Sequence, residues 1–383
     1  MSIDRSCPEV YEDWWLEYAM KEAAVSDLYE LAGVMEKHVS SLSDALTLNR
    51  SDGFAYHELP MNWLAYGLFF FPQNYMRMMF ILEEVSARFD KSFFTGDNLK
   101  VMDLGSGTGA ATFALLDWLK KNRFKGKVEV TCVDQSAMAL KYSKMMAGEV
   151  KAGPAATTIT WLKQSICSPA VPSQKWDIIM SSYALNEAFM ADDDQFAKWT
   201  GELLGSLNKG GILLVCEPME YDKFNRVNAL RDRIIACDGM HVIAPCLHDK
   251  ACPMMKDDEG WCHDVRSWHP TESMRLLNRR LYRKIELLKY SFIVAGRMKK
   301  LPECGFNCAR MIAPVKDEKG RSLMKGCAGD GTIRHYEVQD RALSKEQADD
   351  LDSLERGDVV DYQIEKELRN GKVLRVSSLD SRL

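Results

Sequence analysis

The chain has 383 residues, which is long enough to form two or three structural units with sizeable cores. Hydrophobic residues make up 46% and charged residues 27%, and the formal net charge of −5 excludes a protein that is basic throughout. No apolar stretch reaches the ~18 residues that a membrane-spanning helix needs, so we expect no membrane association.

The first 95 residues predict a helical region. Apolar residues between positions 8 and 47 recur mostly on one helical face, and a second helical run follows Pro72. We interpret the methionines and aromatic residues of these runs as core residues. The first 15 residues are acidic and are typical of neither a secretory signal nor an Arg- and Ser-rich transit peptide.

Residues 96–236 alternate between predicted strands and helices. This alternation predicts a parallel sheet with right-handed crossovers, and therefore an α/β domain of the Rossmann-like class. The expected strands are 99–104, 128–133, 158–162, 176–180 and 212–216. The expected helices are 108–121, 137–146, 196–207 and 221–236, with a turn at 208–211 before the fifth strand.

A Gly-rich turn between the first strand and the first helix indicates a nucleoside site. Its sequence is Asp103-Leu104-Gly105-Ser106-Gly107-Thr108-Gly109. Glycines let the backbone approach a ligand, and the following helix begins with free N–H groups. Asp134 ends the second strand, where an acid accepts hydrogen bonds from ribose hydroxyls in dinucleotide folds.

The spacing of this turn favours S-adenosylmethionine as the ligand. The pattern Asp-x-Gly-x-Gly-x-Gly resembles class I methyltransferases, whereas NAD-binding folds more often show Gly-x-Gly-x-x-Gly; NAD and a turn without a ligand stay as alternatives. Gln164 follows the third strand and is either an adenine contact or an ordinary strand end. The residues that we assign to the cofactor site are Asp103, Gly105, Ser106, Gly107, Gly109, Asp134, Gln135, Gln164 and Ser182.

Seven of the eleven cysteines crowd between positions 237 and 327. Cys246, Cys252 and Cys262 lie in a loop that is rich in His and Pro and has no period, where cysteines have little reason to form a core. Thiolates are soft ligands that suit zinc and iron–sulfur clusters, both of which usually take four ligands. The alternative is a set of free, partly buried cysteines. Candidates for a fourth ligand are Cys327, Cys308, Cys304, Cys237, His248 and His263.

The remainder of the chain predicts two further regions. Residues 237–300 combine the Cys-rich insertion with a basic helix at 274–284 and late sheet strands at 285–295. Residues 301–383 predict a small β-rich region, with strands at 309–315 and 372–376 and an acidic helix at 345–354.

Two clusters of basic residues are candidate phosphate contacts on an otherwise acidic chain. A helix would place the first cluster on one broad face; a solvated charged surface is the alternative for both. The first cluster is Arg275, Arg279, Arg280, Arg283 and Lys284, and the second is Lys120, Lys121, Arg123, Lys125 and Lys127.

Several segments together resemble the methyltransferase-like family of the mitochondrial small ribosomal subunit, which includes methyltransferase-like protein seventeen, its yeast ribosomal counterpart and bacterial relatives. The most specific segment is Pro245-Cys246-Leu247-His248 followed by Cys252-Pro253. The others are Ala65-Tyr66 through Pro72, Tyr75, Leu82-Glu83-Glu84, Val101 to Thr112, Asp177 through Ser182-Tyr183-Ala184-Leu185-Asn186-Glu187, and Gly210-Gly211 to Glu217-Pro218.

The resemblance implies a [4Fe-4S] cluster on Cys246, Cys252, Cys262 and Cys327, the last within Cys327-Ala328-Gly329-Asp330-Gly331. Zinc is the alternative metal. It also implies binding to small-subunit ribosomal RNA, ribosomal proteins or assembly factors, a mitochondrial location, and a monomer outside the ribosomal complex. Because no presequence is visible, a bacterial or cytosolic setting stays open. One departure is Met219-Glu220-Tyr221-Asp222, where the family usually has a Gly-Thr-Pro-like turn.

The sequence identifies no catalytic residue for methyl transfer. The segment Ser181-Ser182-Tyr183-Ala184 lacks the Pro-Pro pair of amino-methylating enzymes, and Cys167 and Cys216 are poorly placed to act as nucleophiles. Asn186 and Glu187 are either near the substrate mouth or cap the next helix. The first hypothesis is therefore a cofactor-binding ribosome assembly factor. The alternatives are an active RNA methyltransferase and a structural ribosomal protein with a relic nucleoside site.

Overall fold

The computed structural model describes residues 4–47, 59–88, 97–166, 174–185, 193–256, 261–298, 307–369 and 373–381. Cys167, Asn186, Glu187 and Cys304 lie outside these residues. The chain divides into two compact units. The first comprises Met1–Glu83, Lys91–Glu202 and Ser267–Leu288, and the second comprises Glu84–Asp90, Leu203–Arg266 and Lys289–Leu383.

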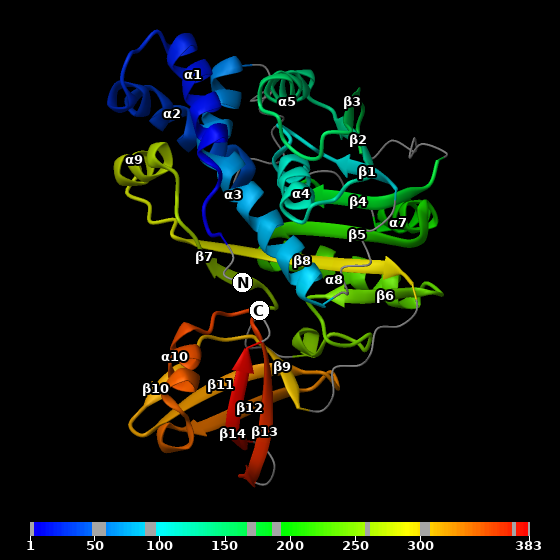
Figure 1. The fold of residues 1–383 in the computed structure, drawn as a ribbon, viewed down its shortest axis with the longest axis vertical. Helices are drawn as coiled ribbons and strands as arrows, with labels where there is room; N and C mark the ends of the chain where they lie inside the picture. Colours follow the sequence, from blue (N-terminus) through cyan, green and yellow to red (C-terminus); the bar gives the residue numbers. More distant parts are fainter. Residues whose placement is uncertain are drawn as a thin grey trace. The chain divides into compact units, whose positions relative to one another are not determined.

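A parallel sheet forms the centre of the first unit, with strand order β3-β2-β1-β4 (Figure 1). Its strands are β1 (Asn98–Leu104), β2 (Lys127–Asp134), β3 (Thr157–Lys163) and β4 (Trp176–Ser182). Strands β1 and β4 are almost entirely buried, as expected for strands covered on both faces. The associated helices are α4 (Ala110–Lys121), α5 (Ala137–Glu149) and α7 (Asp193–Gly205). The predicted alternation of strands and helices is confirmed for these elements.

The N-terminal helices belong to the same unit. They are α1 (Glu9–Ala23), α2 (Leu28–Thr47) and α3 (Pro60–Arg88). The single helical run expected at 8–47 is wrong, because Ala24 adopts a left-handed conformation with φ of 53° and ends α1. Helix α3 begins before Pro72 and continues through it, so burial of its large apolar residues offsets the hydrogen bond that proline cannot make.

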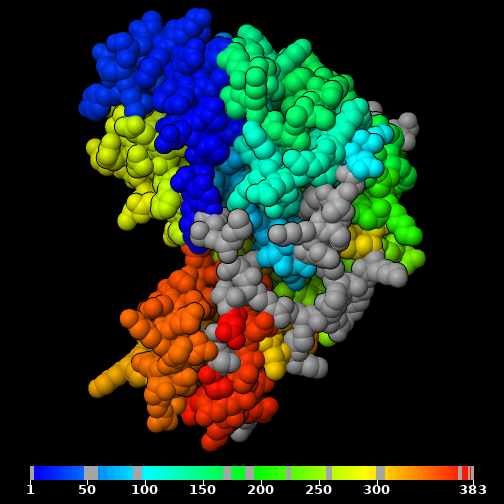
Figure 2. Space-filling model, in the orientation of Figure 1, coloured from blue at the N-terminus to red at the C-terminus, as the bar shows by residue number. Residues whose placement is uncertain are grey.

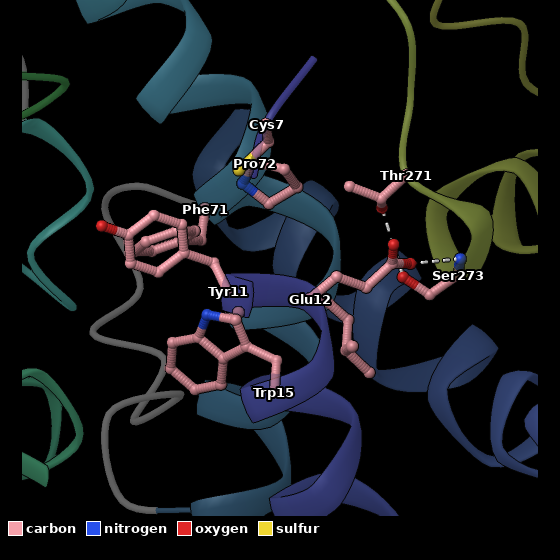
Figure 3. Close-up of a pocket in the computed structure, with 10 residues that line it drawn as sticks. Cys7, Tyr11, Glu12, Trp15, Phe71, Pro72, Thr271 and Ser273 are labelled. Atoms are coloured by element: carbon pink, nitrogen blue, oxygen red, sulfur yellow. Dashed lines mark hydrogen bonds between the residues drawn. The ribbon is translucent and has the colours of Figure 1, made fainter. Parts of the chain in front are cut away.

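Helix α9 (Glu272–Arg280) packs against α2, although more than 200 residues separate them in sequence. Figure 2 shows the yellow-green surface of α9 against the blue surface of the N-terminal helices. Figure 3 shows Glu12 of α1 pointing at the start of α9. There its carboxylate accepts hydrogen bonds from the backbone N–H groups of Ser273 at 2.6 Å and Glu272 at 3.2 Å. A carboxylate at this end of a helix satisfies otherwise unpaired donors and complements the helix dipole.

The second unit contains antiparallel pairs in the order β5-β8-β6, and β7 also pairs with β8. These elements are β5 (Leu207–Pro218), β6 (Met240–Ala244), β7 (Asp264–Ser267), β8 (Leu287–Arg297), α8 (Tyr221–Ala236) and the 3₁₀ turn η3 (Pro253–Lys256). The turn expected at 208–211 is wrong, since β5 begins at Leu207. Gly210, with φ of 84°, supplies the local irregularity within that strand.

The C-terminal residues form a closed barrel. Its strands are β9 (Cys308–Met311), β10 (Lys316–Glu318), β11 (Arg321–Ala328), β12 (Ile333–Gln339), β13 (Val359–Leu368) and β14 (Val373–Ser381). Their order is β10-β11-β12-β14-β13-β9, and an additional pairing of β11 with β9 closes the ring. The connection from β12 to β13 contains η4 (Asp340–Ala342) and α10 (Lys345–Ser353), which is the acidic helix expected from the sequence. Leu351 of α10 is buried against the barrel interior.

Among the helices that the structure describes, none combines the length and apolarity required to cross a membrane.

A buried charge network connects distant segments of the second unit. Arg310 of β9 donates to the Glu84 carboxylate at 2.6 and 3.0 Å and to Asp264 Oδ2 at 2.6 Å. It also donates to the Pro245 carbonyl at 3.3 Å. The side chains of all three charged residues are at most 4% exposed, and the two carboxylates hold the pKa of Arg310 above its ordinary value despite burial. One guanidinium thus connects α3, β7, β9 and the residue that precedes Cys246.

Replacing Gly67 with alanine should destabilise the first unit. A Cβ atom at Gly67 would lie 2.1 Å from Trp15 Cδ2, and Trp15 is 1% exposed, so the indole would have to move. We expect a loss of about 2–3 kcal/mol in the free energy of unfolding, measured by urea denaturation. Gly148→Ala in α5 is the matched control, because its added Cβ meets nothing within 4 Å. If Gly67→Ala and Gly148→Ala had equal free energies of unfolding, the close packing of Trp15 against Gly67 would be contradicted.

Arg310→Met should destabilise the second unit by about 3–5 kcal/mol, because it removes the closest cation from two buried carboxylates. Glu84 and Asp264 would keep the more distant Arg88 at 3.7 Å and Arg266 at 3.5 Å. Arg321→Met is the control, since Arg321 also pairs with carboxylates but its side chain is 37% exposed. A surface pair of this kind contributes about 1 kcal/mol or less. Thermal and urea unfolding of both variants would measure the difference, and equal losses would show that the network is not the stronger constraint.

Candidate functional site

The carboxyl ends of four neighbouring parallel strands bring the predicted nucleoside residues to one sheet edge. Asp103 belongs to β1, Asp134 to β2 and Ser182 to β4, while Gln164 directly follows β3. The edge is held by backbone hydrogen bonds, including Gly105 N–H to Val133 O at 2.8 Å and Gln164 N–H to Asp134 O at 2.9 Å. The carboxyl edge of such a sheet is where ligands bind in open α/β folds.

The three positions of the turn require or permit glycine for different structural reasons. All have positive φ, of 71°, 53° and 91° for Gly105, Gly107 and Gly109. A Cβ at Gly105 would meet the Ala184 side chain at 2.2 Å, and one at Gly109 would meet Phe113 and Ser143 at 2.8 Å. A Cβ at Gly107 would meet nothing within 4 Å. Gly105 and Gly109 therefore permit close packing, whereas Gly107 leaves its backbone exposed to open space, where a ligand can approach.

Asp103 is fully buried beneath this turn. Its Oδ2 accepts a hydrogen bond of 2.6 Å from Thr112 Oγ1, while Oδ1 has no hydrogen-bond partner among the described residues. The pKa of Asp103 is raised to about 7, mainly by burial and also by Asp134, while the hydrogen bond from Thr112 acts against this rise. A buried carboxylate oxygen without a partner is costly, so its presence indicates a site that a ligand or water completes.

Asp134 is oriented by the backbone around it. Its Oδ2 accepts from Gly107 N–H and its Oδ1 from Ser136 N–H, both at 2.8 Å. Burial raises the pKa of Asp134, and these two bonds act against the rise. Each carboxylate oxygen keeps a further lone pair, so the group can still accept hydrogen bonds from a ligand. Gln135 beside it is exposed, and Gln164 and Ser182 are half-buried.

The four predicted cysteine ligands come together in the second unit, from segments up to 81 residues apart. Cys246, Cys252 and Cys262 line one pocket with about 410 Å³ of empty space, part of it open to solvent. Cys327 of β11 packs in the same apolar cluster as Cys252 and Cys262. The pKa of Cys252 is raised to about 11 and that of Cys327 to about 12, mainly by burial and also by the neighbouring Cys246.

Two nitrogen donors contact the sulfur atoms of this pocket. Arg231 of α8 donates from Nε to Cys246 Sγ at 3.2 Å and from Nη2 to the backbone carbonyls of His248 and Lys250. His248 Nδ1 accepts from Lys250 N–H at 3.1 Å, which places the proton of the neutral ring on Nε2, 3.6 Å from Cys327 Sγ. Burial lowers the pKa of His248 to about 4, with Arg231 adding to the effect, so the ring is neutral at pH 7.

This geometry distinguishes among the candidates for the fourth ligand. His248 points a ring N–H at Cys327 and therefore serves as a donor to sulfur. His263 also lines the pocket, and its Nδ1 lies 3.0 Å from the Trp261 carbonyl, which leaves Nε2 as an acceptor. Cys308 packs in a different cluster, with Leu247 and Val359. Within the described ranges, no three His, Cys, Asp or Glu side chains are arranged to hold a metal ion.

The expected basic face at 275–284 is partly engaged in contacts within the chain, whereas Arg275, Arg279 and Lys284 are exposed, so RNA binding by this face stays a prediction. Helix α9 ends at Arg280, whose Nε donates to Glu36 at 2.9 Å. Arg283 donates to Ser43 Oγ at 2.8 Å and lies over the Phe69 ring, and Lys284 pairs with Glu286. In the second basic run, Lys120, Lys121 and Lys127 likewise have intramolecular partners.

Among solved structures, two methyltransferases are similar to this chain, at low sequence identity and with TM-scores under 0.5. A Listeria monocytogenes protein described as a class I S-adenosylmethionine-dependent methyltransferase is 13% identical, with coverage of 77% of this chain and 90% of its own and a TM-score of 0.40. The magnesium protoporphyrin IX methyltransferase of Synechocystis is 14% identical, with coverage of 72% and 99% and a TM-score of 0.35. No curated protein sequence matches the chain.

The family model described as mitochondrial small ribosomal subunit Rsm22 matches residues 60–362, which include the Gly-rich turn, all four candidate ligands and most of the barrel. The chain is therefore a member of the Rsm22 family, with a class I methyltransferase-like α/β fold.

Proposed function

We propose that this protein is a factor of the mitochondrial small ribosomal subunit that binds S-adenosylmethionine, holds a four-iron cluster and binds small-subunit ribosomal RNA to support assembly and translation. Membership in the Rsm22 family supports the ribosomal and mitochondrial parts of the proposal. The observation that supports the cofactor part is that Cys246, Cys252 and Cys262 line one pocket, while Cys327, from a distant strand, packs in the same apolar cluster as Cys252 and Cys262. Free cysteines with no shared role have no physical reason to gather there.

The thiol environment fits a metal cluster. Buried thiols with raised pKa values stay protonated and neutral when nothing is bound, and a bound metal favours the thiolates. Arg231 and the Nε2–H of His248 then compensate negative charge at Cys246 and Cys327. Four soft thiolates suit either an iron–sulfur cluster or zinc, and we prefer the cluster because the family resemblance implies it. When bound, the cluster would crosslink these segments and could accept an electron.

The nucleoside edge fits S-adenosylmethionine. Gly107 offers open backbone, Asp134 offers acceptors for ribose hydroxyls, and the partnerless Oδ1 of Asp103 provides an additional acceptor. The cofactor would supply a methyl group on a sulfonium, or a bound ligand that stabilises the first unit. The protein's own residues bind and orient it; the proposal assigns no residue to methyl transfer.

Asp134→Asn should weaken S-adenosylmethionine binding by about 10- to 100-fold, because hydrogen bonds to a charged acceptor contribute about 1.5–3 kcal/mol. The substitution keeps an acceptor oxygen and so disturbs the turn less than alanine would. Isothermal titration calorimetry on the full chain measures the change. Asp194→Ala, at an exposed position in α7, is the charge-matched control. An affinity of Asp134→Asn equal to that of the control would remove Asp134 from the site.

Anaerobically purified protein should contain about four irons and as many sulfides per chain, with a broad visible absorption band. Cys246→Ser and Cys252→Ser should lose most of the iron and should make the second unit more sensitive to protease. Cys237→Ser is the matched control, because Cys237 lies near in sequence but not among the residues that line the pocket. A colourless protein with one zinc would keep the ligand set and contradict the cluster.

The same variants test the ribosomal part of the proposal. Sedimentation of mitochondrial extracts should place the wild type and Cys237→Ser with precursors of the small subunit. Cys246→Ser should remain in the light fractions. Co-sedimentation of all three proteins with the precursors would show that ribosome binding does not require the cysteine pocket. Absence of the wild type from the precursors would contradict the ribosomal role.

A further inference from the structure

The strand order of the C-terminal barrel identifies a specific architecture. If β9 with its extension β10 is counted as the first strand, then β11, β12, β13 and β14 are the second to fifth. The ring runs first, second, third, fifth, fourth and back to the first, with only β12 and β14 parallel (Figure 1). A helix stands between the third and fourth strands. This is the Greek-key arrangement of the oligonucleotide-binding fold, whose ligands lie on the second and third strands.

From this barrel we infer that the protein binds single-stranded RNA on the outer face of β11, β12 and β14. The inference rests on the RNA binding proposed above and names the surface that performs it. Fold alone does not establish a site, so the case depends on which side chains occupy that face.

Alternation along the strands defines the face. Met324, Tyr336 and Val338 point inward into the barrel core, together with Leu374 and Val376 of β14. Their neighbours therefore point outward, since side chains alternate along a strand. The outward residues form cross-strand rows, with Lys325 opposite His335 and Leu323 opposite Glu337. We call this surface the barrel face; it consists of Arg321, Leu323, Lys325, His335, Glu337 and Arg375, with Lys316 and Lys319 at its margin.

Charge on the barrel is segregated in a way that suits phosphate. In the barrel face and β10, five lysines and arginines accompany three carboxylates, which leaves a net positive charge. Glu337 is shared by Arg321 and Arg375, and Glu318 is shared by Lys316 and Arg321. Helix α10 instead carries four carboxylates and one lysine. The side chains of Lys316, Lys319 and His335 are exposed. A polyanion is therefore attracted to the barrel face and repelled by the α10 side.

One end of the barrel face is already covered by protein. Cys327 and Ile333, which are opposite each other on β11 and β12, pack against Cys252, Met254 and Trp261. RNA must therefore lie toward the other end, over Lys325 and Arg321. Because Lys325 and Cys327 point outward two residues apart on one strand, the RNA would pass directly beside the cysteine pocket.

The side chains also indicate how RNA would be held. The residues named for the barrel face include no Phe, Tyr or Trp, and His335 has the only aromatic ring among them. Tyr336 and Tyr362 face the core. Binding would therefore follow the phosphates and depend little on base identity, with a strong dependence on salt.

Fluorescence anisotropy of the full-length protein with an unstructured oligouridylate of about 12 nucleotides tests the inference. Lys319→Gln/Lys325→Gln should bind roughly tenfold more weakly, and the slope of log affinity against log salt should fall by about 1.4. Lys325→Arg should retain wild-type binding. The matched control is Lys151→Gln/Lys345→Gln, which removes two exposed lysines outside the barrel face. Lys319→Gln alone is a control for misfolding, because Lys319 lies in an exposed connection. It should show about half of the change in slope.

Each outcome is decisive. Weak binding by the barrel-face variants with unchanged binding by the control and by Lys325→Arg supports the inference. Equal affinity of barrel-face and control variants overturns it and leaves the proposed RNA binding intact elsewhere on the chain. No RNA binding by the wild type overturns both. Tighter binding of a duplex than of the single strand overturns the assignment of single-stranded RNA.

Discussion

The second unit depends on one buried cation, the guanidinium of Arg310. It satisfies Glu84 and Asp264 together, and its bond to the Pro245 carbonyl fixes the backbone next to Cys246. Arg310 is also the direct strand partner of Cys327. Since an unpaired buried charge costs several kcal/mol, these four segments can be buried only in the arrangement that brings the charges together. The same arrangement brings the cysteines to their pocket.

A second layer of polar contacts prepares that pocket for its ligands. Arg231 contacts the sulfur of Cys246 and two carbonyls of the Cys-rich loop, and His248 contacts the sulfur of Cys327. Such donors orient metal ligands and set the charge that a site tolerates. They also explain why a loop with no regular period has a defined structure: its backbone hydrogen bonds go to side chains rather than to a helix or strand.

At the predicted nucleoside edge, a carboxylate is buried without a neutralising cation beside it in the described part of the chain, unlike those around Arg310. The turn after β1 accepts positive φ at three glycines and keeps a buried carboxylate with one oxygen unsatisfied among the described residues. Glycine adopts positive φ without strain, whereas the unsatisfied carboxylate oxygen costs stability in the ligand-free chain. Both features persist because the strands on either side are buried and hydrogen bonded along their lengths, so the edge is preorganised by the sheet.

The basic residues show that clusters of charge in the sequence do not by themselves identify a binding surface. Arg280 and Arg283 looked like members of an RNA-binding helix face, yet the structure uses them against α2 and α3. Arg321, Lys325 and Arg375 belong to neither of the basic clusters predicted from the sequence. They lie together because β11, β12 and β14 are neighbouring strands of the barrel. A helical repeat predicts which residues share a face and does not predict what that face contacts.

Local sequence determined much of this protein. Strand and helix alternation, the Gly-rich turn and Asp134 follow from patterns within about 35 residues, because parallel strands joined by crossover helices align their carboxyl ends without further information. The cysteines at 246, 252 and 262 were recognisable as a set because they lie in one His- and Pro-rich loop without a period, while the choice of Cys327 came from family resemblance. Only the tertiary structure decided the role of His248 as a donor, the internal use of Arg280 and Arg283, and the closure of the barrel. These depend on pairings between residues that range from 17 positions apart, for Cys327 and Arg310, to 244 positions apart, for Arg280 and Glu36. Their energies arise from burial and charge neutralisation and leave no periodic trace in the sequence.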